Sequence, residues 1–224
     1  MTDREPTSHE RMSGESWDDS YIGGPAPWDI AAPQPAIARL VARHALAGPV
    51  LDAGCGVGDN ALAIAESGIA VLGFDVAETA LEIARAKAAQ RGLDVEFIAA
   101  DALALERLGR TFETVVDSGL FHTFDAGERR RYARSLAGVT KAGAKLYIVA
   151  FGDEGDERGP HPISRRDIAS AFDVKSAWNV IAIEPERVMT RFHGDAGVAG
   201  WLITAERRSA TPAPAALRTD RTAD

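Results

Sequence analysis

The sequence contains only one cysteine, Cys55, among 224 residues. A single cysteine cannot form a disulfide within the chain or supply a thiolate zinc site, which is consistent with a reducing compartment. The sequence also lacks a run of about 18 apolar residues, which excludes a membrane-spanning helix. Residues 1–20 lack the apolar core of a secretory signal. We therefore expect a cytoplasmic protein with no membrane partner.

An excess of positive charge is also missing. The chain has 25 Lys and Arg against 33 Asp and Glu, a formal net charge of −8. Nucleic-acid binding usually needs clustered Lys and Arg, so this balance opposes a nucleic-acid partner and favours a small molecule. The 46% hydrophobic and 26% charged residues are typical of a globular protein, and the length suits one domain. Nothing in these residues indicates the oligomeric state.

Strands and helices alternate along the chain. We expect strands over 50–53, 70–74, 95–98, 114–117 and 145–151, and helices over 35–45, 59–66, 78–91, 128–139 and 165–172. This alternation predicts a doubly wound, Rossmann-like α/β sheet, mostly parallel, with helices on both faces. Two further strands without a helix between them, 177–184 and 200–206, predict an antiparallel C-terminal pair.

The polar ends of the chain predict two disordered tails, 1–20 and 208–224, around a domain that covers residues 21–207. Both ends lack the apolar periodicity of a packed helix or strand.

The most informative motif is VLDAGCGVGDN, residues 50–60, in which an apolar strand enters a glycine-rich turn and then a helix. Glycines allow a sharp turn close to a ligand, and the helix start offers free N–H groups to an anion. A G-x-G-x-x-G dinucleotide loop would need glycine where the chain has Asp59, so an NAD-dependent reductase is disfavoured. A plain strand-to-helix turn is the structural alternative.

The acid two residues before the first glycine gives D-x-G-x-G-x-G, which resembles motif I of the class I S-adenosylmethionine-dependent methyltransferases. The resemblance implies that S-adenosylmethionine is the cofactor, with the acid toward its ammonium and the loop N–H groups toward its carboxylate. The implied cofactor-binding residues are Asp52, Gly54, Cys55, Gly56 and Gly58. A nonenzymatic module that binds an adenosine ligand is the competing interpretation.

Acids follow the next two expected strands. Asp75 lies about twenty residues after the loop and can accept hydrogen bonds from ribose hydroxyls, or it can cap the following helix. By the resemblance, Asp101 receives the adenine amino group with Ala102 beside the ring, although alone Asp101 would be an ordinary loop residue. The resemblance also implies that Val76 and Asp117 contact the cofactor.

Residues 114–124, TVVDSGLFHTF, bring the acceptor candidates to the same edge of the sheet. The Asn/Asp-Pro-Pro-aromatic motif of amino methyltransferases is absent here, which counts against a nucleobase or glutamine substrate. His122 is the candidate catalytic base, because an unperturbed pKa near 6.5 lets it take a proton at neutral pH; a place in the pocket wall is the alternative. Ser118 and Phe121 are the expected substrate contacts beside it.

The acidic loop FGDEGDERG, residues 151–159, could supply hard oxygen ligands for magnesium, as in catechol-type methyltransferases. Its glycines and charges equally suit a solvated loop. We expect no bound metal.

The segment YIGGPAPWDIAAPQP, residues 21–35, together with DSGLFH, residues 117–122, resembles bacterial small-molecule methyltransferases related to thiol and thiopurine methyltransferases. That group includes mycobacterial enzymes that methylate hydroxyquinolones and quinols. The resemblance implies a lid over residues 21–46, with Trp28 at the cofactor and Tyr21 at the substrate; a Pro-rich arm held by one buried Trp is the alternative.

Together these features predict a methyltransferase that acts on a hydroxyl oxygen of a small aromatic or heterocyclic molecule, similar to a quinolone or quinol. Methylation of a thiol sulfur is the alternative activity.

Overall fold

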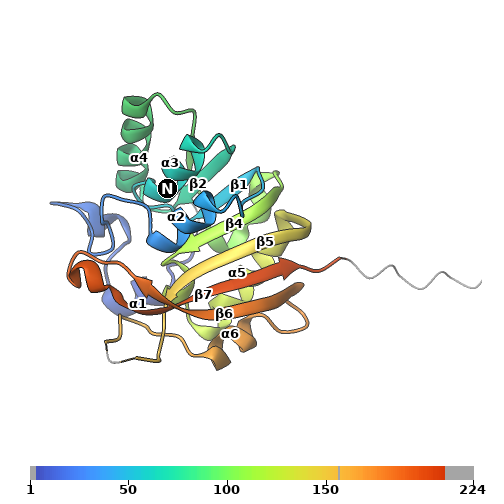
Figure 1. Ribbon diagram of the computed structural model, residues 1–224. Helices are drawn as coiled ribbons and strands as arrows, with labels where there is room; N and C mark the ends of the chain where they lie inside the picture. Colours follow the sequence, from blue (N-terminus) through green and yellow to red (C-terminus); the bar gives the residue numbers. More distant parts are fainter. Residues whose placement is uncertain (1–3, 156, 210–224) are drawn as a thin grey trace, which may run out of the picture.

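The computed structural model describes residues 4–155 and 157–209, which fold around a seven-stranded sheet (Figure 1). Its order is β3-β2-β1-β4-β5-β7-β6. The first five strands in this order are parallel, and β7 is antiparallel to both β5 and β6. The strands are β1 (Val50–Ala53), β2 (Val71–Asp75), β3 (Glu96–Ala99), β4 (Phe112–Ser118), β5 (Thr140–Phe151), β6 (Trp178–Val188) and β7 (Val198–Arg207).

This topology confirms the predicted Rossmann-like sheet with an antiparallel C-terminal end. The sequence pattern did not reveal that β7 inserts between β5 and β6. The longest strand, β5, therefore has one parallel and one antiparallel neighbour.

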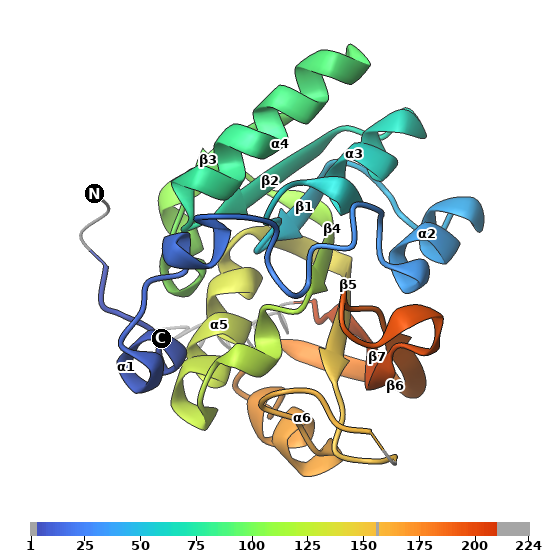
Figure 2. The ribbon, with the colours of Figure 1, turned by 90° about the vertical axis from the view of Figure 1, so that its left-hand side faces the viewer.

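Helices cover both faces of the sheet (Figure 2). On one side lie α2 (Pro35–Ala42), α3 (Asp59–Glu66) and α4 (Glu78–Arg91), and on the other lie α5 (Ala126–Gly138) and α6 (Arg165–Ala171). Successive residues of β1 enter different core clusters: Val50 packs with Ile37 of α2, and Leu51 belongs to the cluster that contains Leu136 of α5. Because strand side chains alternate between faces, burial of both faces requires the nearly continuous apolar strands of this sequence.

The remaining helical segments are short. They are α1 (Ser8–Ser13), η1 (Asp18–Tyr21), η2 (Ala102–Leu108), η3 (Phe121–Thr123) and η4 (Gly194–Ala196).

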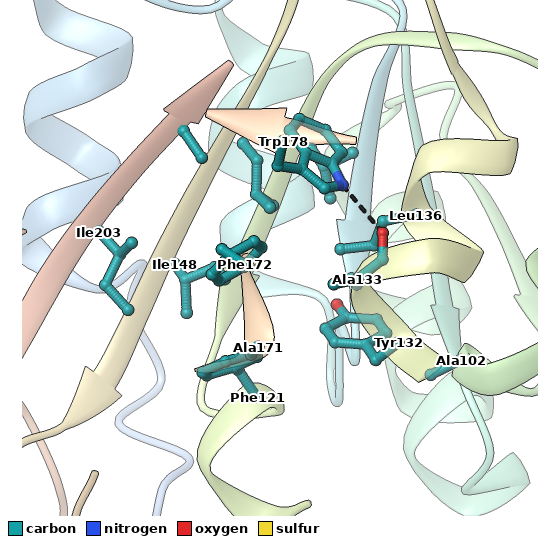
Figure 3. Close-up of a cluster of buried hydrophobic side chains, with 14 of the residues drawn as sticks. Ala102, Phe121, Tyr132, Ala133, Leu136, Ile148, Ala171, Phe172, Trp178 and Ile203 are labelled. Atoms are coloured by element: carbon teal, nitrogen blue, oxygen red, sulfur yellow. Dashed lines mark hydrogen bonds between the residues drawn. The ribbon is translucent and has the colours of Figure 1, made fainter. Parts of the chain in front are cut away.

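The edge of the sheet is held to α5 by a buried tryptophan. Trp178, at the start of β6, is 1% exposed, and its Nε1 donates to the backbone oxygen of Ala133 at 2.9 Å (Figure 3). The indole thereby buries a large apolar surface while its one polar atom keeps a partner.

The prediction that residues 1–20 form a disordered tail is wrong for residues 4–20. These residues begin the N-terminal arm, which we define as residues 4–34 and which leads into α2. Helix α1 starts with a capping box: the Thr7 side chain accepts from the Glu10 backbone N–H, and the Glu10 carboxylate accepts from the Thr7 N–H at 2.8 Å. This reciprocal pair satisfies two N–H groups that a short helix would otherwise leave free.

Polar contacts join the N-terminal arm to helices on both sides of the sheet. The backbone N–H of Ser8 donates to Glu128 of α5 at 2.8 Å, and the Arg11 guanidinium lies 3.1 Å from the same carboxylate. At the other end of the arm, Asp18 accepts from the Thr79 N–H at 2.8 Å, in the first turn of α4. The tail prediction failed because it looked for apolar residues, whereas hydrogen bonds hold this segment.

Of the predicted C-terminal tail, residues 208–224, only Arg208 and Ser209 lie within the described residues. The Arg208 N–H donates to the Ala177 oxygen at 2.9 Å, which continues the pairing at the end of β7. Among the residues that the structure describes, no helix is long and apolar enough to cross a membrane.

Replacement of Ser8 by Ala should lower the free energy of unfolding by about 1–2 kcal/mol. Its hydroxyl donates to the buried Glu128 and accepts from the Asp125 N–H at 2.9 Å, so the variant leaves a buried carboxylate short of a donor. Urea denaturation of the full chain measures the change. Ser13→Ala, on the exposed side of the same helix, should change it by less than about 0.5 kcal/mol; equal effects would contradict the anchoring role of Ser8.

Candidate functional site

A cavity of about 390 Å³ lies at the carboxyl ends of β1, β2 and β4. The strand order reverses here, because the chain runs from β1 outward to β2 and β3 and then returns to β4 on the other side. Ligands of doubly wound sheets bind at this position. The N-terminal arm, the loop after β5 and the connection between β6 and β7 surround the same edge of the sheet (Figure 2).

The glycine loop after β1 forms one wall of the cavity. Gly54, Gly56 and Gly58 have φ angles of +66°, +51° and +84°, which side chains other than glycine rarely adopt. A Cβ on Gly54 would also lie 2.9 Å from the Leu120 Cβ. Gly54, Cys55 and Gly56 line the cavity, but Gly58 does not. The predicted ligand contact of Gly58 is therefore corrected: this glycine shapes the turn into α3.

Asp75, at the end of β2, holds the glycine loop in place and lines the cavity beside Val76. Its carboxylate accepts from the Gly56 N–H at 2.9 Å, from the Val76 N–H at 2.7 Å and from the Ala77 N–H at 3.0 Å. The N-cap of α4 is Ala77, so Asp75 is not the helix cap that the sequence left open. Burial raises the pKa of Asp75 above its ordinary value, although these N–H donors oppose the shift.

Asp101 and Ala102 follow β3 and also line the cavity. The Asp101 carboxylate accepts from the Leu103 N–H at 2.8 Å and caps η2. The cap orients the side chain while leaving it at the cavity wall, so Asp75 and Asp101 place two acidic groups at this end.

Two predicted cofactor contacts lie behind the wall and do not line the cavity. Asp117, at 0% exposure, accepts from the Tyr132 hydroxyl at 2.9 Å and from the Leu120 N–H at 3.0 Å. Asp52 is 1% exposed, and neither of its carboxylate oxygens has a hydrogen-bond partner. Burial raises the pKa of each carboxyl group to about 7. Their direct contact with a ligand is corrected to a place beneath the glycine loop and the turn after β4.

The predicted lid residues meet over the glycine loop. Trp28 Nε1 donates to the Tyr21 hydroxyl at 3.0 Å, and a Cβ on Gly56 would lie 3.0 Å from that same oxygen. Tyr21 is 7% exposed and Trp28 is 40% exposed, and both line the cavity. Trp28 is thus not the buried anchor of the structural alternative; Tyr21 takes the buried position.

His122 and Ser118 line the opposite end of the cavity, after β4. The His122 ring is 5% exposed, packs 4.6 Å from the Phe151 ring, and its buried Nδ1 has no hydrogen-bond partner. Burial lowers the pKa of His122 to about 3, and His161 and Arg129 act in the same direction. The ring is therefore neutral over the physiological pH range.

Phe121 does not line the cavity, and its predicted substrate contact is wrong. The side chain is 0% exposed and stacks on Phe172, with ring centroids 5.5 Å apart. Figure 3 shows it among the core side chains between α5 and the sheet. In the short turn η3, adjacent residues point in different directions, so His122 faces the cavity and Phe121 faces the core.

The sequence analysis missed two parts of the wall. One comes from the N-terminal arm and the other from the connection after β6; they contribute Arg4, Thr7, His9, Trp17, Met189, Phe192 and His193. The first had a recognisable signal, since TSHE, residues 7–10, has the S/T-x-x-E pattern of a capping box. No comparable motif marks the second.

The described residues include no group of three or more His, Cys, Asp or Glu side chains that could hold a metal ion. In the acidic loop after β5, Glu154 lies 3.3 Å from Arg165, and Asp156 lies outside the described residues.

The protein family described as "Methyltransferase domain" matches residues 50–143. The 2-heptyl-1-hydroxyquinolin-4(1H)-one methyltransferase of Mycobacteroides abscessus is 34% identical over 203 residues, which cover 81% of this chain and 88% of the relative. Probable thiol methyltransferase 2 of Arabidopsis thaliana is 30% identical over 196 residues, 82% of this chain and 86% of that protein.

A solved structure described as "Conversion of a Disulfide Bond into a Thioacetal Group during Echinomycin Biosynthesis" has a similar fold. The TM-score is 0.74 at 33% identity, with 83% of this chain and 86% of the other covered. The similarity extends over most of the chain and is not confined to the glycine loop.

The buried carboxylate of Asp52 predicts how stability depends on pH. Because the folded pKa is about 7, above the value of about 3.9 for an exposed Asp, the folded state keeps a proton that the unfolded state has released. The contribution of Asp52 to stability is therefore present below about pH 4 and is lost as the pH rises to about 7.

Asp52→Asn removes this ionisation, so between pH 4 and 8 its stability should improve relative to wild type by up to about 4 kcal/mol, measured by urea denaturation. Asp117→Asn is the matched control: it removes a carboxyl group of similar pKa that has hydrogen-bond donors, so it should gain less. A difference between Asp52→Asn and wild type that is constant with pH would argue against a raised pKa.

Proposed function

Because the chain belongs to the S-adenosylmethionine-dependent methyltransferases, we propose that it methylates a hydroxyl oxygen of a small heterocyclic acceptor of the hydroxyquinolone type. The chain is a small-molecule methyltransferase; the acceptor and the methylated atom belong to the proposal. Its main support is the two-ended cavity, which has carboxylates at one end and His122 at the other.

The carboxylate end fits the cofactor. Asp75 Oδ2 accepts only the Gly56 N–H, which leaves a lone pair for a ribose hydroxyl. Asp101 lies at the end of the next strand, where it would receive the adenine amino group. The loop from Gly54 to Gly56 would hold the methionine part, since a Cβ at either glycine would crowd Leu120 or Tyr21.

When bound, S-adenosylmethionine supplies a methyl group whose bond to the positively charged sulfur breaks as the bond to the acceptor oxygen forms, leaving S-adenosylhomocysteine and a proton that passes to solvent. The residues of the chain align the acceptor and exclude water. Tyr21 and Trp28 close the cofactor end, and Phe151 and His122 shape the acceptor end.

The neutral state of His122 restricts the chemistry of the acceptor. With a pKa of about 3, the imidazole is a poor base: removal of a proton from a phenol of pKa about 10 would be uphill by roughly 7 units, about 10 kcal/mol. We expect acceptors that ionise near neutral pH, such as N-hydroxy heterocycles. His122 then orients the anionic oxygen through an N–H group, and of the two roles considered from the sequence we favour orientation over proton removal.

A thiol acceptor is the second candidate function. Thiols also ionise near neutral pH, with a reference pKa of about 8.5 for Cys, and the Arabidopsis relative is named as a probable thiol methyltransferase. The same neutral imidazole suits either anion, so the product distinguishes the two activities.

Incubation of the full chain with S-adenosylmethionine and separate acceptors should methylate 1-hydroxyquinolin-4(1H)-one on oxygen, faster than an unactivated phenol. Formation of S-adenosylhomocysteine and mass spectrometry of the product measure this. As a control, Asp75→Ala should weaken calorimetric binding of S-adenosylmethionine by 1–3 kcal/mol. Turnover of thiophenol without turnover of the hydroxyquinolinone would support the thiol alternative and reject the oxygen acceptor.

His122→Ala should lower kcat/KM for the hydroxyquinolinone by about 10-fold or more, whereas His122→Asn, which keeps a hydrogen-bond donor, should recover part of this loss. In wild type and variants alike, kcat/KM should rise with pH to a plateau set by the pKa of each acceptor. A pH dependence common to all acceptors that disappears in His122→Asn would instead show that His122 removes the proton.

A further inference from the structure

Two histidines from distant parts of the chain meet at the acceptor end of the cavity. His9 belongs to α1, and His161 belongs to the loop between β5 and α6. His9 Nδ1 lies 3.5 Å from His161 Nε2, the two rings are nearly perpendicular at 82°, and both residues line the cavity with His122.

Each ring is held in its place by the surrounding structure. His9 stacks on Trp17, with ring centroids 4.3 Å apart and an interplanar angle of 19°. His161 has a φ of +51°, an uncommon backbone conformation for a residue other than glycine. The loop is fixed two residues later, where the Ile163 N–H donates to the Phe151 oxygen at 3.0 Å. Backbone strain that is maintained in this way is often found at binding sites.

The pairing determines what the two rings can offer to a ligand. A neutral imidazole has one N–H and one lone pair. If His9 Nδ1 donates to His161, then His9 Nε2 is an acceptor and His161 Nδ1 a donor; the reverse assignment exchanges these roles. Among the described residues, neither of these outer nitrogens has a hydrogen-bond partner. The neutral pair therefore offers one donor and one acceptor in either arrangement.

The charged groups around the pair favour an electron-rich ligand atom. Arg129 of α5 approaches from the side of His122, with its Nη2 3.5 Å from the His122 backbone oxygen and its buried Nε unpartnered. Arg11 lies on the same helix as His9, but the carboxylates of Asp125 and Glu128 are its ion-pair partners. None of the described residues that line this end of the cavity adds a free carboxylate beside the rings.

We propose that His9 and His161 form a subsite that holds a second oxygen of the acceptor, remote from the oxygen that is methylated. A conjugated carbonyl or enol oxygen fits, because it can accept from one ring and, as the hydroxyl tautomer, donate to the other. The subsite rests on the proposed function and makes the N-terminal arm a determinant of acceptor choice.

The test compares two acceptors that differ in this second oxygen. 1-Hydroxyquinolin-4(1H)-one carries a ring carbonyl, and thiophenol has no oxygen. His9→Phe keeps a ring to stack on Trp17 but removes both nitrogens. It should weaken calorimetric binding of the hydroxyquinolinone to the protein loaded with S-adenosylhomocysteine by about 10-fold, and lower kcat/KM equally. Binding of S-adenosylhomocysteine and kcat/KM for thiophenol should stay within about twofold.

His161→Asn, which tolerates the left-handed backbone, should reproduce these effects. The double variant should lose little more than either single variant, because the two rings act as one unit. Ser13→Ala, exposed on the same helix as His9, should behave as wild type.

Equal losses for both acceptors would show that the histidines have only a structural role, and no loss for the hydroxyquinolinone would also reject the subsite. If wild type neither binds nor methylates the hydroxyquinolinone, the proposed function is wrong and the subsite is rejected with it. A wild type that methylates it while His9→Phe fails to discriminate rejects the subsite alone.

Discussion

The parallel pairing of β1 with both of its neighbours is the constraint on which the site depends. Ala53 at the end of β1 lies in register with Phe74 of β2 and Asp117 of β4. The residues that follow these three positions, Gly54, Asp75 and Ser118, are thereby brought to one edge of the sheet. The carboxylate of Asp75 then accepts from the Gly56 N–H, which ties the turn after β1 to the end of β2. The shape of the glycine loop follows from this register.

The same arrangement concentrates negative charge where little water can reach it. Asp52, Asp75 and Asp117 are all carboxyl groups whose pKa burial raises. Backbone N–H groups offset the cost for Asp75, and the Tyr132 hydroxyl does so for Asp117. Arg4 of the N-terminal arm adds a positive charge: it binds Glu10 and is near enough to Asp75 for that carboxylate to raise its pKa. The arm therefore counters charge that the sheet alone leaves uncompensated.

The N-terminal arm also couples the two ends of the cavity. Asp18 binds the first turn of α4, beside the cofactor end, and Ser8 binds Glu128 of α5, beside the acceptor end. Trp17 and His9 lie between these contacts and line the cavity. Because the contacts are hydrogen bonds at the surface of the domain, the arm can open with less loss of apolar burial than a core helix would need. Passage of ligands through this side is consistent with the gating role of lids in other enzymes.

The sequence by itself determined the sheet, the glycine loop and the acids after β2 and β3, because strand periodicity and the spacing D-x-G-x-G-x-G are local properties of the chain. Confirmed elements include β1, which has the predicted bounds, and the antiparallel C-terminal end. Only the tertiary structure decided that Asp52, Asp117 and Phe121 lie behind the cavity wall, since a one-residue step in a tight turn changes the direction of a side chain. Likewise, the order β5-β7-β6 and the meeting of His9 with His161 depend on contacts between residues far apart in the chain. No local pattern encodes such contacts, because they form only when the sheet and the N-terminal arm pack together.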